Sequence, residues 1–168
     1  MSNPSHIITA ARLAARIRPG QRLIGLDLGE KTIGVALSDA LLMTATPWTT
    51  IHRGKFTPDA QRLIQLAEEE NAAAFILGLP VNMDGSSGPR VQATRAFARN
   101  MGRLTDIPLV LWDERLSTAG VERTLIEADV SRSRRAKVVD KLAASWILQG
   151  FLDHLNALRG SAGHTEQT

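Results

Sequence analysis

Residues 23–37 read LIGLDLGEKTIGVAL, and this stretch decides the fold. Two apolar runs flank a polar turn at residues 29–31, which predicts two antiparallel strands joined by a tight hairpin. Asp27 stands inside the first run, among residues suited to a buried strand. An uncompensated carboxylate in such a place costs several kcal/mol. We therefore expect Asp27 to serve chemistry rather than folding.

Two kinds of nucleotide site are the alternatives for this stretch. Gly25, Lys31 and Thr32 nearly match the pattern G-x-x-x-x-G-K-[ST], but Glu30 replaces the second glycine. A phosphate cradle consists of converging backbone N–H groups, and a glutamate there would repel the phosphates. The other candidate, the phosphate-touching hairpin of the actin and sugar-kinase superfamily, needs a second lobe. The length of 168 residues suits one ordinary domain, so neither alternative fits.

The composition narrows the chemistry further. Cysteine is absent, which removes disulfides, thiolate metal sites and cysteine nucleophiles. The four histidines are scattered without the spacing of metal ligands. The formal charge is only +3, but residues 131–137 read SRSRRAK, a cluster that fits either a solvated loop or a phosphate-binding surface. No apolar run approaches the ~20 residues of a membrane span, so no contact with a membrane is expected.

The remaining pattern predicts the element order β-β-β-α-β-α-β-α-α. After the hairpin, further strands are expected at residues 48–51, 73–79 and 109–112. Four helices are expected between and after them: from Pro58 to about Asn71 with Thr57 as cap, from Pro89, from Ser117 to about Glu127, and from about Ala136 to Leu158. The predicted fold class is α/β, with a five-stranded mixed sheet of three antiparallel and then two parallel strands, flanked by helices.

Three parts of the chain follow from this order. Residues 1–21 form a basic N-terminal extension, whose amphipathic, Arg-rich segment 7–18 is interpreted as a short helix in preference to a transit peptide. Residues 22–158 form the main domain. Residues 159–168 are polar and Gly-containing, which predicts a flexible tail.

Acidic residues from three separate elements are expected to meet. Asp140 shares a helical stripe with residues that must face the sheet, namely Ala143, Ala144, Ile147 and Phe151. Asp27 comes from the first strand, and Asp113 or Glu114 from the end of the last strand. Clustered carboxylates repel one another, and a hard divalent cation such as Mg²⁺ removes the conflict. A pair of such ions ~4 Å apart can stabilise both the attacking and the leaving oxygen of a phosphodiester.

Each acid also has a structural explanation. Asp113 or Glu114 would then pair with Arg115 or cap the following helix, and both arrangements are common. Ser86, Ser87 and Ser117 have no plausible histidine base, and helix capping accounts for them. The presence of all three acids together favours the metal site.

Four segments resemble the YqgF/RuvX family, the Holliday-junction-resolvase-like proteins of bacteria that are also described as pre-16S rRNA nucleases. The segments are IGLDLGEKTIGVALSD at 24–39, GLPVNMDG at 78–85, WDERLST at 112–118 and VDKLAA at 139–144. The resemblance implies an RNase H-like fold, a cytoplasmic bacterial location and metal-dependent cleavage of nucleic acid. It further implies that Asp27, Glu114 and Asp140 are the catalytic, metal-binding acids. Glu114 is preferred to Asp113, the alternative ligand, because its longer side chain reaches further beyond the strand.

The leading hypothesis is a hydrolase in which Mg²⁺ or Mn²⁺ activates water against a phosphodiester at the ends of precursor rRNA. Candidates to position the phosphate backbone and border the cleft are Lys31, Asn82, Arg115, Arg134, Arg135 and Lys137. Only 4% of the residues are aromatic, which favours recognition by shape and backbone over base stacking.

Two other functions remain open. A four-way DNA junction resolvase would use the same acids but requires a two-fold dimer for paired cuts, whereas a monomer or weak homodimer is expected here. A non-catalytic RNA-binding or transcription-associated factor would use the fold as a platform. The retention of three acids disfavours this factor, because carboxylates that face phosphate do not help a pure binding module.

Overall fold

The computed structural model describes residues 6–82, 84–116 and 132–165, with the side chains of residues 6–82, 84–116 and 141–161. Five strands form one sheet: β1 (Arg22–Leu28), β2 (Thr32–Ser38), β3 (Ala45–His52), β4 (Ala72–Leu79) and β5 (Leu109–Asp113). Their order in the sheet is β3-β2-β1-β4-β5. The first three pair antiparallel, while β4 pairs parallel with both β1 and β5. The predicted mixed sheet is confirmed.

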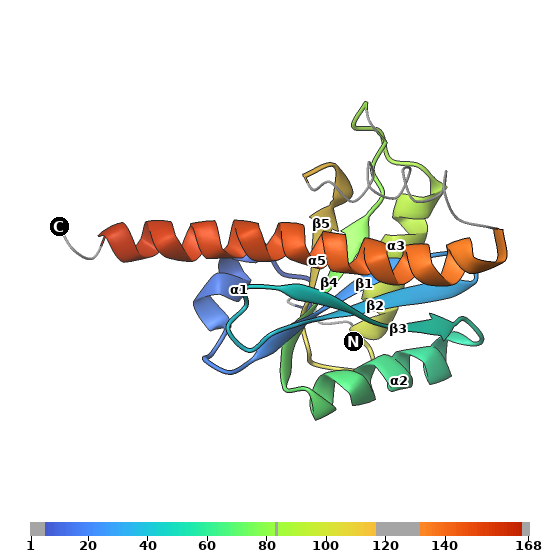
Figure 1. Cartoon of the computed structure of the whole chain (residues 1–168), viewed down its shortest axis with the longest axis horizontal. Coiled ribbons are helices and arrows are strands. Elements are labelled where there is room, and N and C mark those ends of the chain that lie inside the picture. The colour runs from blue at the N-terminus through green and yellow to red at the C-terminus, as the bar shows by residue number, and fades with distance from the viewer. Residues whose placement is uncertain (1–5, 83, 117–131, 166–168) are drawn as a thin grey trace.

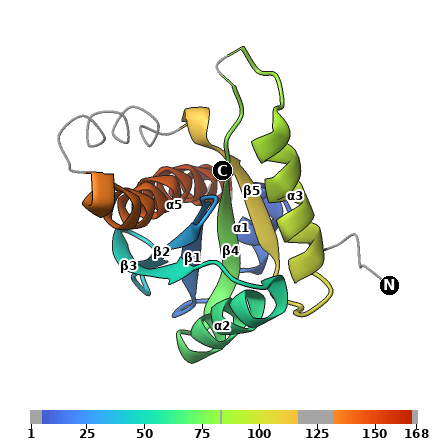
Figure 2. The ribbon, with the colours of Figure 1, turned by 90° about the vertical axis from the view of Figure 1, so that its right-hand side faces the viewer.

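Helices cover both faces of this sheet (Figures 1 and 2). The long helix α5 (Arg132–Thr165) crosses one face and packs against β1, β2 and β3. Helices α2 (Phe56–Glu69) and α3 (Pro89–Met101) lie on the opposite face, and the short helix α1 (Ala10–Arg16) contacts α5. The carboxyl-terminal part of α5 projects beyond the sheet, whereas its first turns lie at the same end of the molecule as the β1–β2 hairpin (Figure 1).

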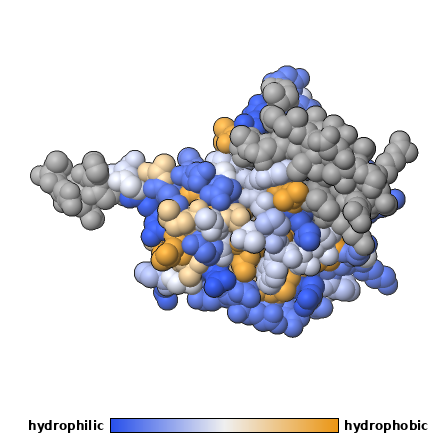
Figure 3. All heavy atoms as spheres, viewed as in Figure 1, coloured by the Kyte–Doolittle hydropathy of each residue, from blue (hydrophilic) through white to orange (hydrophobic). Residues whose placement is uncertain are grey.

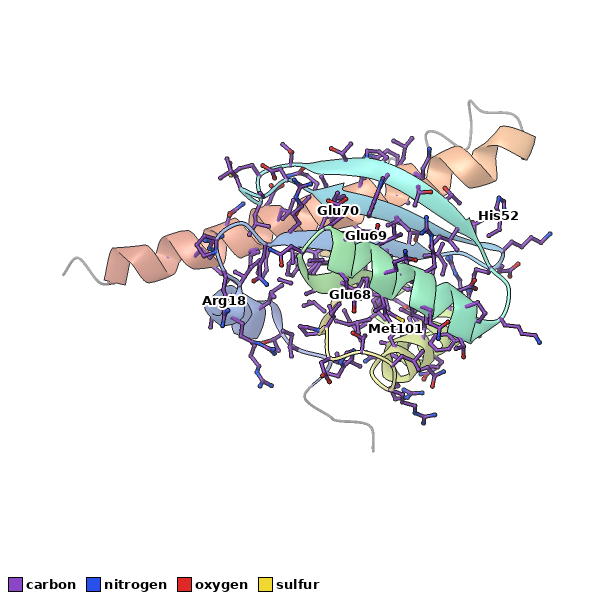
Figure 4. The ribbon with its side chains drawn as sticks, turned by 90° about the horizontal axis from the view of Figure 1, so that it is seen from below. Arg18, His52, Glu68, Glu69, Glu70 and Met101 are labelled. Carbon is purple, nitrogen blue, oxygen red and sulfur yellow. The ribbon has the colours of Figure 1, made fainter. Side chains whose placement is uncertain are left out.

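Two apolar cores result, because successive strand residues point to opposite faces. On the α5 face, Leu23 and Ile76 pack with Phe151 of the helix. On the other face, Ile24 and Phe75 pack with residues of α2 and α3, among them Leu63, Phe97 and Met101. Figure 4 views this second layer from below, with Met101 at the end of α3 and three consecutive glutamates, Glu68, Glu69 and Glu70, at the end of α2. The continuous apolar runs of β1 and β4 thus reflect burial on both faces.

Three helix boundaries differ from the sequence-based prediction. α2 begins at Phe56 with Lys55 as its N-cap, so Thr57 is not the cap. Instead, the carboxylate of Asp59 accepts a hydrogen bond of 3.0 Å from the backbone N–H of Gly54 and so ties down the segment before the helix. α5 begins at Arg132, so most of the basic stretch 131–137 is helical rather than a loop. It ends at Thr165 and not near Leu158. The helix expected from Ser117 lies outside the described residues.

The N-terminal extension packs onto the domain. The hydroxyl of Thr9 caps α1 by accepting from the N–H of Arg12, and Leu13 of this helix is 1% exposed. The segment before α1 runs beside β5, where Ile7 forms a parallel bridge with Leu109. Two backbone hydrogen bonds of 2.9 Å hold it there, from Ile8 N–H to the Leu109 carbonyl and from Leu109 N–H to the His6 carbonyl.

Where Figure 3 colours the surface on the α5 side, polar and apolar residues of the described chain are mixed. Among the described residues, the exposed large apolar side chains are Leu41, Met43, Leu104 and Leu116. Leu41 and Met43 belong to the loop between β2 and β3, which α5 holds through hydrogen bonds from Gln149 and Asn156. None of the helices in the described part of the chain is both long and apolar enough to span a membrane.

Candidate active site

The carboxyl ends of three strands meet at one edge of the sheet. β1, β4 and β5 run parallel, with β4 in the middle, so the chain leaves all three at the same end. β1 continues into the hairpin at residues 29–31, β4 into the loop at residues 80–88, and β5 into a short 3₁₀ turn, Glu114–Leu116. Predicted site residues follow or end each of these strands, so the topology gathers them.

Asp27 lies on the face of the sheet that α5 covers. Gly25, two residues earlier on the same face, is so close to this helix that a Cβ atom there would stand 2.8 Å from the Ala144 carbonyl oxygen. Asp27 pairs with Gly34 of β2, and the register that joins Leu26 to Leu77 brings Gly78 of β4 to its other side. The carboxylate, on a residue only 3% exposed, therefore stands between two positions without side chains.

Glu114 occupies the space above one of these glycines. Its Oε1 atom lies 2.8 Å from the position that a Cβ of Gly78 would take. Asp27 stands beside Gly78 on the neighbouring strand, and adjacent strands are ~4.8 Å apart, so Glu114 and Asp27 occupy neighbouring positions on the same face of the sheet. Trp112 pairs with Gly78, and Glu114 stands two residues after Trp112. The turn after β5 allows the side chain of Glu114 to reach back over the sheet. The structure thus brings together two of the predicted acids.

Asp113 is engaged elsewhere. Its carboxylate forms a forked ion pair with Arg115, with Nη2 2.7 Å from Oδ2 and Nε 3.1 Å from both oxygens. These hydrogen bonds from Arg115 hold the pKa of Asp113 below its usual range. Strand alternation also places Asp113 on the face opposite Trp112 and α5. The geometry therefore favours Glu114 over Asp113 as the partner of Asp27.

The loop residues 80–82 and 84–88 border this edge and are held by their own side chains. The amide of Asn82 donates to the Ser86 hydroxyl at 3.0 Å, and Asp84 accepts from both the N–H and the hydroxyl of Ser86. These bonds from Ser86 lower the pKa of Asp84. Arg115 lies beside the loop, with Nη1 3.5 Å from the position of a Cβ on Gly85. Asn82 and Arg115 thus lie at the predicted edge, but Arg115 is already paired.

Lys31 lies exposed in the β1–β2 hairpin. The hairpin is held by Arg53, whose N–H donates to the Lys31 carbonyl at 2.8 Å and whose Nη1 donates to the Gly29 carbonyl at 2.6 Å. Sequence reasoning missed the contributions of Gly78 and Arg53. The signal for Gly78 was available, because a glycine inside an apolar strand often marks a close approach of another group.

The remaining predicted residues lie in the first turns of α5. Asp140 stands one helical turn before Ala144, which packs over Gly25. Its side chain, and those of Arg134, Arg135 and Lys137, lie outside the described residues. Where side chains are described, no three acidic or histidine residues form a group suited to a metal ion. The three-acid set therefore stays a prediction, of which the described structure contains two members.

Comparison with known proteins finds relatives that match nearly the whole chain. A protein of Methylocella silvestris named "Putative pre-16S rRNA nuclease" is 60% identical over 158 residues, which cover 94% of this chain and 98% of that protein. A protein of Rhizobium meliloti with the same name is 61% identical over 158 residues, covering 94% and 96%.

Among solved structures, Thermus thermophilus RuvC in complex with a Holliday junction substrate superposes with a TM-score of 0.51 at 10% identity, over 81% of this chain and 96% of that chain. This likeness concerns the fold, which is RNase H-like. Residues 21–154 match the family described as RuvX: Holliday junction resolvase. The four motifs, the mixed sheet and these matches lead to one conclusion: the chain belongs to the RuvX family.

Proposed function

We propose that this protein is a metal-dependent endonuclease that hydrolyses phosphodiester bonds at the ends of precursor 16S rRNA. The observation that carries the proposal is the position of Glu114 over Gly78, next to Asp27 on the neighbouring strand, at the edge where three parallel strands end. A folded protein gains no stability from two carboxylates brought together at a partly buried edge. Their approach is useful when a cation joins them.

The donor set fits a hard divalent cation. Mg²⁺ and Mn²⁺ prefer carboxylate oxygens, and Mg²⁺ uses one or two of them while it keeps several waters. Asp27 and Glu114 would hold the ion, and Asp140, one turn before Ala144 on α5, would supply the third carboxylate. Such an ion supplies Lewis-acid stabilisation of the phosphoryl oxygens and a nucleophilic water at neutral pH.

The protein's own groups have separate tasks in this proposal. The close packing of α5 on Gly25 fixes the position of Asp27 relative to the helix. The Asp113–Arg115 pair fixes the turn from which Glu114 extends, because it locks the residues on either side of Glu114. Lys31 and Asn82 border the edge from two sides and are candidates to contact the substrate backbone, together with Arg134, Arg135 and Lys137 at the start of α5.

RNA is preferred to junction DNA as the substrate because relatives about 60% identical over nearly their full length carry the rRNA nuclease name. The family description instead names Holliday junctions, so the junction is the competing substrate. Paired cuts across a junction require a two-fold dimer. The oligomeric state in solution therefore discriminates between the two substrates, and we expect a monomer or weak homodimer.

Cleavage assays test the proposal. The purified protein is incubated with labelled precursor 16S rRNA and, separately, with a four-way DNA junction, in Mg²⁺, Mn²⁺ or EDTA. We expect cleavage of the rRNA that requires a divalent ion and is lost in Asp27→Asn. Asp153→Asn, an exposed change on α5, is the control and should cleave normally. Cleavage that persists in EDTA or in Asp27→Asn would refute the metal mechanism. Failure to cut either substrate with any ion would favour the non-catalytic binding factor.

A further inference from the structure

A second polar site lies at the same edge of the sheet, on the face opposite the acids. It is a hollow of about 90 Å³ between the β1–β2 hairpin and α3. Leu28, Gly29 and Glu30 line it from the hairpin, Arg53 from the end of β3, and Arg90 and Thr94 from the first turns of α3. Figure 4 shows His52, the neighbour of Arg53, at the end of the molecule opposite Arg18.

No ion pair within the described part of the chain neutralises the arginines of this hollow. Ion pairs among the described residues join Arg22 to Glu70 and Arg115 to Asp113, and neither involves Arg53 or Arg90. Arg53 uses its Nη1 atom on the Gly29 carbonyl, which turns its guanidinium toward the hairpin and leaves other N–H groups available. Arg90 contributes its carbonyl to the Thr94 hydroxyl, and its guanidinium has no hydrogen-bond partner in the described part of the chain.

Glu30 also lines the hollow, and its negative charge offsets part of the positive charge of the two arginines. It is exposed on the hairpin and forms no ion pair with Arg53 or Arg90 in the described structure. The hollow therefore carries a net charge of +1 from two guanidinium groups and one carboxylate. A planar guanidinium offers a fork of donors that matches phosphate oxygens, and two such forks in the lining of one hollow suit one phosphate group.

The hollow lies next to Asp27, at the end of the same strand. Leu28 and Gly29 follow Asp27 directly, so the hollow begins one residue after the acid. Because strand residues alternate, Asp27 faces α5 while Leu28 faces the core beneath α2 and α3. The last residues of β1 therefore separate an acidic site from a basic one. A nucleic-acid strand that crosses this edge would meet both.

We propose that the hollow between Arg53 and Arg90 binds a backbone phosphate of the substrate strand, near the phosphate that the acids hold for cleavage. This inference rests on the proposed nuclease function and assigns it two residues. The ligand chemistry is a phosphodiester, which RNA and DNA share. Contacts to phosphate fix the register of a strand without reading its sequence, so the hollow sets where the strand lies relative to Asp27.

Binding measured without cleavage tests the proposal. A short fluorescein-labelled single-stranded RNA, and a DNA of the same sequence, are titrated with the full-length protein in EDTA over a range of salt concentrations. Arg90→Gln and the double variant Arg53→Gln/Arg90→Gln are compared with Arg99→Gln, an exposed change further along α3. The slope of log K against log salt is negative, and each lost phosphate contact should reduce its magnitude by about 0.7. Because the two arginines hold one phosphate, we expect the slope to lose about 0.7 of its magnitude in the double variant and to stay unchanged in the control.

Several outcomes separate this inference from the nuclease proposal. If the wild-type protein cleaves and binds RNA but both variants keep its affinity and salt slope, the hollow is not a phosphate site and the nuclease function stands. If the wild-type protein neither binds nor cleaves nucleic acid, both proposals fail. Arg53→Lys is a control for damage to the hairpin. It keeps the positive charge, so it should retain most of the wild-type salt slope. A salt slope that falls in the variants for DNA alone, and stays at the wild-type value for RNA, would also overturn the assignment to the rRNA substrate.

Discussion

The two faces of the sheet are built from the same strands and both bury large apolar side chains, but they differ in how closely neighbouring groups approach the strands. On the α2 and α3 face, large residues such as Phe75, Phe97 and Met101 fill the interface. On the α5 face, Gly25 and Gly78 allow the helix and Glu114 to come close to the strands. Both faces stabilise the fold, but the α5 face gives up apolar volume at these two glycines, next to the carboxylates. Small residues thus mark the functional face.

The largest expected effect comes from the α5 face. Asp27→Asn should reduce the cleavage rate by more than the roughly 10–100-fold that substitutions around a metal's ligands cause. The free energy of unfolding should stay the same or rise, because the change removes a buried charge. Single-turnover cleavage and thermal unfolding measure the two quantities. A variant that unfolds more easily and still cleaves would assign Asp27 to the core instead.

Leu63→Ala tests the opposite face. Leu63 is fully buried beneath α2, so its truncation should lower the free energy of unfolding by about 2–5 kcal/mol. The cleavage rate, measured well below the melting temperature, should remain close to the wild-type rate. Denaturant unfolding with parallel activity assays checks this pattern. Equal losses of rate from the two faces would remove the distinction between them.

Gly78→Ala sharpens the comparison with a single methyl group. The new Cβ would stand 2.5 Å from Ile147 Cδ1 and 2.8 Å from Glu114 Oε1, so one of them must move. We expect a loss of about 1–3 kcal/mol in stability together with slower cleavage. Gly54→Ala is the matched control, because no atom lies within 4 Å of its added methyl group. Identical behaviour of the two variants would contradict the close approach of Glu114.

The smallest expected effect is a pH dependence of stability, caused by a residue that lies away from both faces. His6 is buried against Gly102, and its Nε2 atom has no hydrogen-bond partner among the described groups. Burial lowers the pKa of His6, although the charge of Asp106 opposes the shift. The unfolded chain then binds a proton more readily, so stability is full above the usual pKa of about 6.5 and falls as the pH drops below it.

Unfolding of the wild-type protein and of His6→Leu at about pH 7.5 and 5.5 measures this contribution. The wild-type protein should lose more stability between these conditions than the variant, which has no titrating group at position 6. A difference of the opposite sign would show that His6 is protonated in the folded protein.

Much of the fold followed from local pattern. The hairpin around residues 29–31 and the apolar runs of β4 and β5 are encoded in short stretches, and Asp27 stood out because it interrupts one of them. The boundaries of α2 and α5 could not be predicted from local sequence pattern. Asp59 ties down the segment before α2 in place of a capping Thr57, and α5 continues through Gly160 because a solvent-exposed helix tolerates a glycine at modest cost.

The site was harder to derive than the fold. The choice between Asp113 and Glu114 depends on which one Arg115 binds, and adjacent residues give no sign of this in the sequence. The place of Glu114 over Gly78 depends on the register of three strands that are distant in the chain. The hollow between Arg53 and Arg90 joins a strand end to a helix start, and only the assembled sheet brings them together.

The short pairing of the N-terminal segment with β5 has a consequence for handling the protein. β5 is an outer strand, and the backbone of Leu109 is satisfied on its free side by His6 and Ile8. Unpaired groups on an outer strand are a template for joining a second chain edge to edge. A chain shortened to begin after Ile8 should therefore self-associate at high concentration. Light scattering of the full-length and shortened proteins would reveal the difference.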